Sequence, residues 1–224
     1  DSNRLVYVTG PESGTVKIPQ PAELLAAMRS TENMAVKPYE EKAVATSLLS
    51  KMPAAGKLVS RKEDKVMGVT DLVFSNGVSV TLKSTDFKND QILMGATRAG
   101  GKNYYGLADK YNAEYAVSVV SAMGVGDFSP VDLRKVLAGK TVSVSPSIAD
   151  VSDGFRASSG KKDLETMLQL VYLYVTKPRK DTALFNSFIQ KNKSQFAAVG
   201  ANPQTAFIDT MFSVMYKKNP LAPI

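Results

Sequence analysis

Apolar and polar residues alternate with a period of two in six short segments of the chain, and this alternation predicts β-strands. The segments are residues 4–9, 72–74, 78–82, 91–99, 141–145 and 154–158. Asn76 and Gly77 lie between the second and the third segment, and this pair is typical of a two-residue type I′ turn, in which both central residues have a positive φ. We therefore expect residues 72–99 to form three consecutive strands of one sheet, which the rest of the chain covers.

Apolar residues recur every three or four positions elsewhere, and this spacing predicts helices. We expect them at residues 22–29, 104–123, 129–139 and 161–176, from Asp181 onward, and from Asn202 to Lys218. Ser129, followed by Pro130, has the features of an N-cap. The side chains expected to face the core are Leu164, Met167, Leu168, Val171, Tyr172 and Val175 in one helix, Leu184, Phe185, Phe188 and Ile189 in the next, and Phe207, Met211, Val214 and Met215 in the last.

From residue 70 onward the predicted order is β-β-β-α-α-β-β-α-α-α. Strands grouped in hairpins and followed by helices indicate an α+β fold, with a largely antiparallel sheet and helices packed on one face. Residues 1–10 are interpreted as the final strand of a preceding domain. Residues 11–69 are polar and contain several prolines, with an amphipathic part at 39–52, and are interpreted as an interdomain connector with short helices.

Composition narrows the possible functions. The chain has 224 residues, 44% of them apolar and 22% charged, which is typical of a globular protein. It contains neither cysteine nor histidine, so thiolate and imidazole chemistry is excluded, both for catalysis and for zinc binding. The formal net charge is +7, but the basic residues are scattered, which indicates a solvated surface and not a nucleic-acid site. No apolar run is long enough to span a membrane, and the first residues resemble an internal segment and not a leader.

Three local patterns could carry chemistry, and each has a simpler structural interpretation. Gly100, Gly101 and Gly106 lie between a strand and a helix, where they could cradle a phosphate, but their spacing favours a turn. The segment Ser158-Ser159-Gly160-Lys161 could supply a Ser-Lys pair, although neighbours in such a turn usually cap a helix. Asp127, Asp132, Asp150 and Asp153 are candidate oxygen ligands whose spacing matches no calcium loop. The residues alone thus indicate an α+β domain without a catalytic constellation.

Three long blocks occur in order along the chain: SNGVSVTLKSTDFKNDQILMGATRAGG, GVGDFSPVDLRKVLAGKTVSVSPSI and GFRASSGKKDLETMLQLVYLYVTKPR. Together they resemble the pitrilysin/insulinase family of zinc metallopeptidases, in particular the non-catalytic second half of its bacterial members, while residues before 70 resemble the connector that precedes this half. The resemblance covers nearly the whole chain. It implies a metallopeptidase-like half domain of the mitochondrial-processing-peptidase type over residues 70–224, with further helix and strand beyond the last residue.

In catalytic halves of this family, zinc is held by the inverted motif His-x-x-Glu-His, which begins the helix after the glycine turn. On the alignment that the resemblance implies, Asp109 and Ala113 occupy the two His positions and Asn112 the Glu position. Asn cannot act as a carboxylate base and Ala offers no ligand. The resemblance therefore implies that this segment binds no zinc and carries no catalytic residue, and that zinc belongs to the catalytic half of the parent protein.

The resemblance further implies that this half closes a chamber over unfolded peptides. Its partners would be the catalytic half of the same polypeptide and peptide substrates, with a periplasmic or secreted location favoured over a cytoplasmic one. No substrate-binding residue is carried over, but residues 91–99 with Gly100 and Gly101 are expected to line the chamber wall. The alternatives are a subunit of a heteromeric peptidase, a basic module that binds anionic polymers, and a stand-alone hydrolase that uses carboxylates.

Overall fold

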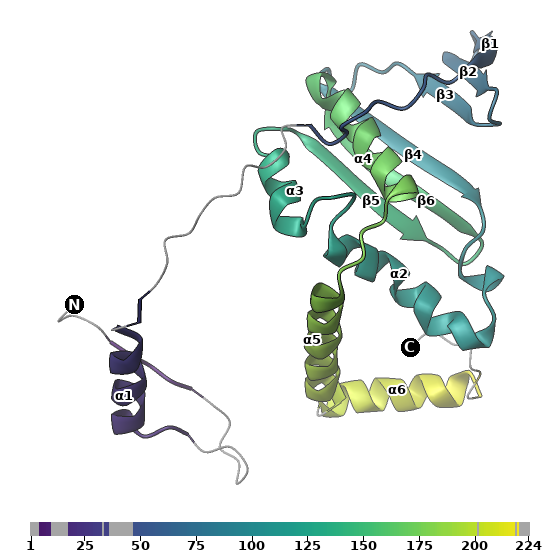
Figure 1. The fold of residues 1–224 in the computed structure, drawn as a ribbon. Coiled ribbons are helices and arrows are strands. Elements are labelled where there is room, and N and C mark those ends of the chain that lie inside the picture. Colours follow the sequence, from purple (N-terminus) through teal and green to yellow (C-terminus); the bar gives the residue numbers. More distant parts are fainter. Residues whose placement is uncertain are drawn as a thin grey trace. The chain divides into compact units, whose positions relative to one another are not determined.

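The computed structural model describes residues 5–9, 18–32, 34–35, 47–200, 202–217 and 219 (Figure 1). The chain divides into two compact units, residues 1–43 and 44–224, and each is described by itself. In the first unit, helix α1 (Pro21–Glu32) confirms the helix expected at 22–29. Residues 5–9 form no strand in this structure, and their role as the final strand of a preceding domain stays a prediction. Of the amphipathic part at 39–52, residues 39–46 lie outside the described residues, and residues 47–52 form no helix.

The second unit contains two three-stranded antiparallel sheets. One has the order β1-β2-β3, formed by Leu58–Asp64, Val69–Phe74 and Ser79–Lys83. The other has the order β4-β6-β5, formed by Gln91–Ala99, Ser152–Gly160 and Val142–Ile148. The prediction that residues 72–99 form one sheet is therefore wrong. β4 pairs with β6, which lies more than fifty residues later, and a local pattern of alternation contains no information about such a distant partner.

Strand β1 is not among the expected strands, because its sequence LVSRKED lies inside the expected connector and alternates poorly. Its side chains are almost all exposed, so the strand is held by backbone pairing with β2 and not by an apolar face. The carboxylate of Asp64 accepts hydrogen bonds from the Val66 and Met67 amides, at 2.9 and 3.0 Å, which shapes the turn between the two strands. The first sheet thus begins before residue 70, while the boundaries of the expected domains stay a prediction.

The β2–β3 hairpin is confirmed, but its turn is not of type I′. Gly77 has a φ of 85°, whereas Asn76 has no positive φ. The Gly77 amide donates to the Phe74 carbonyl at 2.9 Å, and the Phe74 amide donates to the Val78 carbonyl, also at 2.9 Å. These bonds define a three-residue loop, in which a turn at residues 75–76 is followed by a left-handed glycine.

The remaining helices lie close to their expected positions. They are α2 (Lys110–Met123), α3 (Pro130–Val136), α4 (Leu164–Thr176), α5 (Thr182–Gly200) and α6 (Pro203–Met215). α2 begins later than expected, because residues 102–104 and 107–109 form two short 3₁₀ turns around Gly106. The expected caps are confirmed: Ser129 accepts from the Asp132 amide, and Asn202 accepts from the Gln204 amide. None of the helices in the described part of the chain combines the length and apolar character that a membrane span needs.

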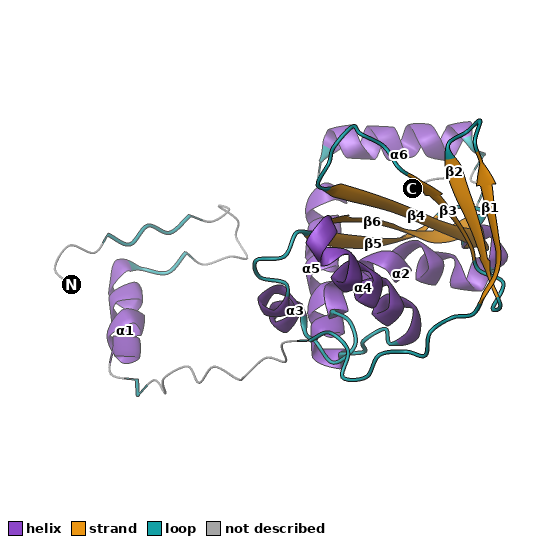
Figure 2. Ribbon diagram, turned by 90° about the horizontal axis from the view of Figure 1, so that it is seen from above, coloured by secondary structure: helices purple, strands orange, loops and turns teal. Residues whose placement is uncertain are grey.

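Helices α2 and α4 pack on the β4-β6-β5 sheet, so the second unit has the predicted α+β arrangement (Figure 2). One core cluster consists of Leu48, Val125, Phe128, Leu170 and Leu173. Val125 is fully buried at the turn after α2, where its amide and the Phe128 carbonyl form a bond of 3.1 Å. This cluster joins the turn, α4 and the segment around Leu48 into one core.

The buried face of α4 matches the prediction only in part: Met167 is buried as expected, but Leu170 and Leu173 were not among the residues expected in the core. Met167, Leu170 and Leu173 are 1–3% exposed, whereas Leu168 is 49% exposed. The two faces could not be distinguished in the sequence, because nine of the thirteen residues of LETMLQLVYLYVT are apolar and cover the helix all round. In α5, three of the four side chains expected to face inward, Leu184, Phe188 and Ile189, are partly buried, and only Phe185 is exposed. The inward face expected for α6 is wrong, since the following side chains are exposed: Phe207, Met211, Val214 and Met215.

Replacing Leu170 tests which face of α4 is buried. We expect Leu170→Ala to lower the free energy of unfolding by about 2–5 kcal/mol, because it leaves a cavity in the core. Leu168→Ala is the matched control on the same helix, and it should change the free energy by less than about 1 kcal/mol. Urea denaturation followed by circular dichroism measures both. Equal losses for the two variants would contradict the observed packing.

Candidate functional site

The glycine turn between β4 and α2 is fixed by the loop that joins β5 to β6. The backbone amides of Gly100, Lys102 and Asn103 donate to the carbonyls of that loop, at 2.8–3.2 Å, and the Gly101 amide donates to the Asp153 carboxylate at 2.9 Å. Gly101 has a φ of 88°, and a Cβ there would lie 2.5 Å from a backbone nitrogen of the loop. Since these amides already have partners, the turn interpretation is confirmed, and a phosphate would find none of these four donors free.

Lys102, Glu114 and Asp150 form an ionic cluster beside the glycine turn. The Lys102 ammonium lies 3.0 Å from the Glu114 carboxylate of α2 and 3.6 Å from the Asp150 carboxylate of the β5–β6 loop. The hydrogen bond to Glu114 raises the pKa of Lys102, burial partly opposes this effect, and the Glu114 and Asp150 charges add to it. Lys102 thus stays protonated at neutral pH and connects the turn, the helix and the loop.

The three positions that align with the zinc motif do not form a metal site. Asp109 and Asn112 are exposed, and the Asn112 amide donates to the Asp109 carboxylate at 2.9 Å. Ala113 is 6% exposed and packs inward. Zinc needs three or more donors that converge on one point, and this set supplies one carboxylate and one amide that bond to each other. In the described part of the chain, no group of three His, Cys, Asp or Glu side chains could hold a metal ion.

The remaining candidates from the sequence are not brought together. Ser158 and Ser159 are neighbours in β6 and therefore point to opposite faces of the sheet, so the two hydroxyls cannot both face Lys161. Ser159 is 2% exposed, and its hydroxyl has no hydrogen-bond partner among the described residues. The segment ends strand β6 and leads through a 3₁₀ turn at Lys161–Asp163 into α4.

The four candidate oxygen ligands also have separate structural tasks. Asp132 belongs to the N-cap of α3, where the Ser129 hydroxyl donates to its carboxylate at 2.6 Å. Asp153 binds the Gly101 amide and lies 3.1 Å from the Arg98 guanidinium. Asp150 faces Lys102, and Asp127 lines a hollow beside the connection between α4 and α5. The first three carboxylates hold the ends of elements in place.

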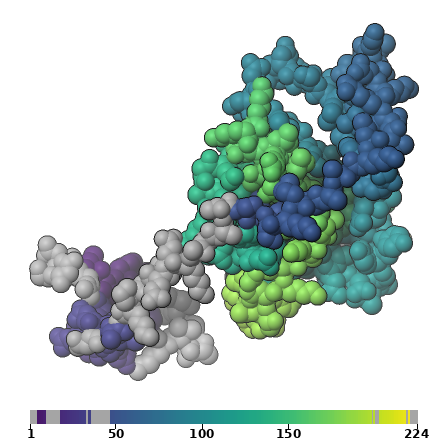
Figure 3. Space-filling model, turned by 45° about the horizontal axis from the view of Figure 1, so that its top comes forward, coloured from purple at the N-terminus to yellow at the C-terminus, as the bar shows by residue number. Residues whose placement is uncertain are grey.

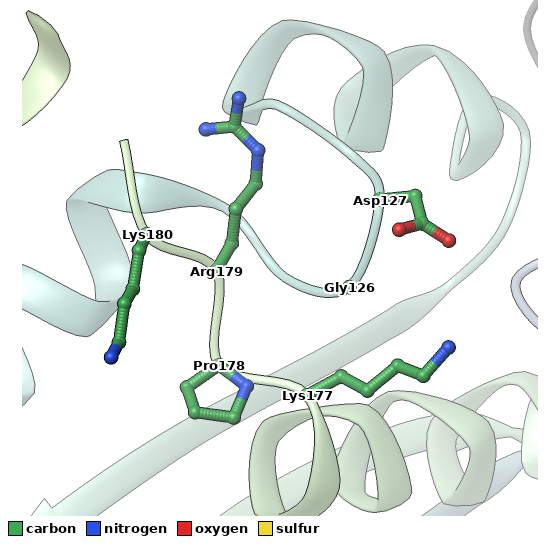
Figure 4. A pocket seen from close by; sticks show the side chains of 6 residues that line it. All are labelled: Gly126, Asp127, Lys177, Pro178, Arg179 and Lys180. Atoms are coloured by element: carbon green, nitrogen blue, oxygen red, sulfur yellow. The ribbon is translucent and has the colours of Figure 1, made fainter. Parts of the chain in front are cut away.

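The hollow has a volume of about 600 Å³ and lies where the turn after α2 meets that connection (Figure 4). It is lined by Gly126, Asp127, Lys177, Pro178, Arg179 and Lys180. The Arg179 guanidinium donates to the Met123 carbonyl at 3.0 Å and to the Asp181 carboxylate at 2.7 Å, so its charge is engaged. Figure 4 shows the Lys177 and Lys180 side chains extending to opposite sides. The sequence showed these basic residues only as helix ends, and their arrangement does not converge on a ligand.

The geometry thus defines an α+β unit, and its described part contains no group of side chains that could hold a metal ion. The comparisons identify the family that it resembles. The chain is 26% identical over 186 residues to a zinc protease PQQL-like protein of Arabidopsis thaliana, and this match covers 83% of the chain and 17% of that protein. It is 31% identical over 111 residues to the probable zinc protease PqqL of Haemophilus influenzae, covering 49% of this chain and 12% of that protein. No family model matches the sequence.

Two solved structures have the same fold. The periplasmic protease PqqL from Escherichia coli superposes with a TM-score of 0.65 and 20% identity, over 88% of this chain and 22% of that one. A mutant of the ferredoxin protease FusC, in complex with Arabidopsis ferredoxin, superposes with a TM-score of 0.70 and 16% identity, over 93% of this chain and 23% of that one. The resemblance to the pitrilysin/insulinase zinc peptidases and the α+β fold class are confirmed. The chain spans less than a quarter of the length of each of these relatives.

Gly101→Ala tests the glycine turn. We expect this variant to lose more than about 2 kcal/mol of unfolding free energy, because the new Cβ adds a clash with the β5–β6 loop to the cost of a positive φ. Gly106→Ala is the matched control, since a Cβ at Gly106 meets nothing within 4 Å. Chemical denaturation measures both, and a tolerated alanine at residue 101 would contradict the described turn.

Asp181→Asn tests the charge at the start of α5. The Leu184 amide and then the Arg179 guanidinium hold the pKa of Asp181 below its ordinary value of 3.8. A carboxyl group whose pKa is lowered on folding stabilises the fold at pH values above its ordinary pKa. This contribution is lost as the pH falls through the lowered pKa. Because Asn still caps the helix, the variant removes mainly the charge. We expect the wild type to be more stable than the variant at pH 7 and this difference to shrink below pH 4 in urea denaturation; a difference that stays constant would contradict it.

Proposed function

We propose that the chain is part of the non-catalytic half of a zinc metallopeptidase, and that it closes a chamber and helps to position unfolded peptides. The similarity in sequence to two zinc proteases supports membership in a protease of this kind. The fold shared with two solved proteases supports the interpretation as a half domain. Since the relatives are several times longer, the rest of the parent polypeptide would supply the zinc and the catalytic half.

The non-catalytic assignment is supported by the residues that stand at the three positions aligned with the zinc motif. Ala113 packs into the core, and the side chains of Asp109 and Asn112 bond to each other. A zinc peptidase uses its motif to hold the ion and to activate water, and neither task suits these residue types. The role proposed for this half is therefore mechanical and steric.

The proposal also includes a surface that contacts the substrate and a cellular compartment for the protein. Strand β4 with Gly100 and Gly101 would face the chamber, and the 73% exposed Leu93 is then a natural contact for an extended peptide. A periplasmic or secreted location in a bacterium is supported by the solved relative that is described as a periplasmic protease. The catalytic half of the same polypeptide would be the permanent partner.

The test uses the complete parent protein. We expect the double variant Asp109→Ala/Asn112→Ala to keep the zinc content of the wild type and to cleave an unstructured peptide within about twofold of its rate. Deleting residues 70–224, together with any remaining part of the same half, should keep the zinc and abolish cleavage. Loss of zinc in the double variant would contradict the non-catalytic assignment.

A cross-linking experiment covers the case in which the deleted protein does not fold. A photoreactive group at residue 93 of the intact protein should capture the peptide, and the same group at residue 66, on the exposed β1–β2 turn, serves as the control. Capture only at residue 66 would overturn the placement of β4 in the chamber wall. A parent protein that holds no zinc and cleaves nothing would overturn the peptidase role and favour a basic binding module.

A further inference from the structure

Helix α4 contacts the rest of the chain on two of its three sides. One side, with Met167, packs on the β4-β6-β5 sheet. A second side lies against the segment at residues 47–52: Leu48 belongs to the same core cluster as Leu170, and the Gln169 amide lies 3.6 Å from the Met52 sulfur. Together these two sides account for the buried apolar residues of the helix.

The third side of α4 is also apolar, yet it is exposed. Leu164, Leu168, Tyr172 and Val175 recur with the spacing i, i+4, i+8, i+11 and are 36%, 49%, 39% and 62% exposed. At 1.5 Å per residue this stripe is about 16 Å long. Figure 3 shows green side chains of this part of the chain at the surface, beside the dark blue residues around 50. A helix that is apolar all round is normally covered on every side, so the α4 stripe has the composition of a contact surface.

Basic residues stand at both ends of the α4 stripe. Lys161 and Lys162 precede its first leucine, and Lys177 and Lys180 follow its last valine, all four with exposed side chains. Three acidic residues lie near these ends in the chain: Asp163 is buried, Asp181 pairs with Arg179, and the exposed Glu165 accepts a hydrogen bond of 2.9 Å from Gln169. The surface thus combines an apolar centre with a positive charge at each end.

We propose that the α4 stripe is a docking surface for an amphipathic helix that carries carboxylates at both of its ends. The apolar side of such a helix would cover Leu168 and its neighbours, and its terminal carboxylates would lie near Lys161 and Lys162 at one end and near either Lys177 or Lys180 at the other. The charges argue against a second copy of this chain, because pairing two such stripes, parallel or antiparallel, brings lysines next to lysines. This inference goes beyond the proposed function and does not depend on it.

Binding of synthetic peptides to the 224-residue chain tests the proposal. The probe is a fluorescently labelled helical peptide of about 18 residues. It has leucines at the same spacing and two glutamates at each end, and the matched probe has lysines in their place. We expect the glutamate-ended peptide to bind at least about tenfold more tightly in fluorescence anisotropy, with an affinity that falls as salt is added. The double variant Lys161→Glu/Lys180→Glu should shift the preference toward the lysine-ended peptide.

Two further variants separate docking from folding. Leu168→Glu and Val175→Glu should each weaken binding at least about tenfold while keeping the circular dichroism spectrum and unfolding midpoint of the wild type. Val66→Glu, on the β1–β2 turn, is the control for a charge at an exposed apolar side chain outside the stripe and should leave binding unchanged. Equal binding of both peptides, or no effect of Leu168→Glu, overturns the proposal.

Two other occupants would be recognised in the same experiments. A wild-type chain that dimerises, and that Leu168→Glu turns into a monomer in sedimentation, would assign the stripe to a second copy and overturn the proposal. Binding to phosphatidylcholine/phosphatidylglycerol vesicles through the stripe, with no binding of the glutamate-ended peptide, would assign it to a lipid surface and overturn it as well. Retained peptide binding by a monomeric chain supports it.

Discussion

The pairing of β6 with both β4 and β5 is the interaction on which the rest of the second unit depends. β6 runs between two strands that lie about fifty residues apart in the chain, and it brings Ile92 and Val142 to either side of Ser159. Gly154 allows β4 to come close, because a Cβ there would meet the Ala96 carbonyl. α4 covers the inward face of this sheet, so the core depends on the pairing of segments that lie far apart in the chain.

The position of α2 depends on the same pairing. Once β5 and β6 form a hairpin, its loop presents carbonyls and the carboxylates of Asp150 and Asp153 to the chain that leaves β4. The glycine turn binds to this loop through four backbone amides, and Gly101 is required there by its φ and by the space it leaves. The two 3₁₀ turns then lead into α2, which explains why the helix begins at Lys110 and not at Tyr104.

Local features could be predicted from the sequence, and non-local ones could not. The caps at Ser129 and Asn202 and the hairpin at Gly77 depend on neighbouring residues, and they lie where the sequence predicts them. The partner of β4 depends on a segment far along the chain, and the exposed strand β1 has no apolar face that a pattern could reveal. The buried face of α4 was ambiguous because both faces are apolar. The absence of ligand types at the aligned motif was visible in the sequence, but the ionic cluster around Lys102 required the fold.

The ionic cluster adds to the interactions that fix the shape of this region. Lys102, Glu114 and Asp150 connect the turn, the helix and the loop, but their side chains are 31–76% exposed, and exposed ion pairs contribute at most about 1 kcal/mol each. The Gly101 amide, by contrast, is buried and donates to the Asp153 carboxylate. Leaving either of these two groups without a partner would cost more free energy of folding than losing an exposed ion pair. Backbone bonding thus dominates, and the charges add to it. A region held in this way can supply a fixed wall, which is the property that the proposed role requires.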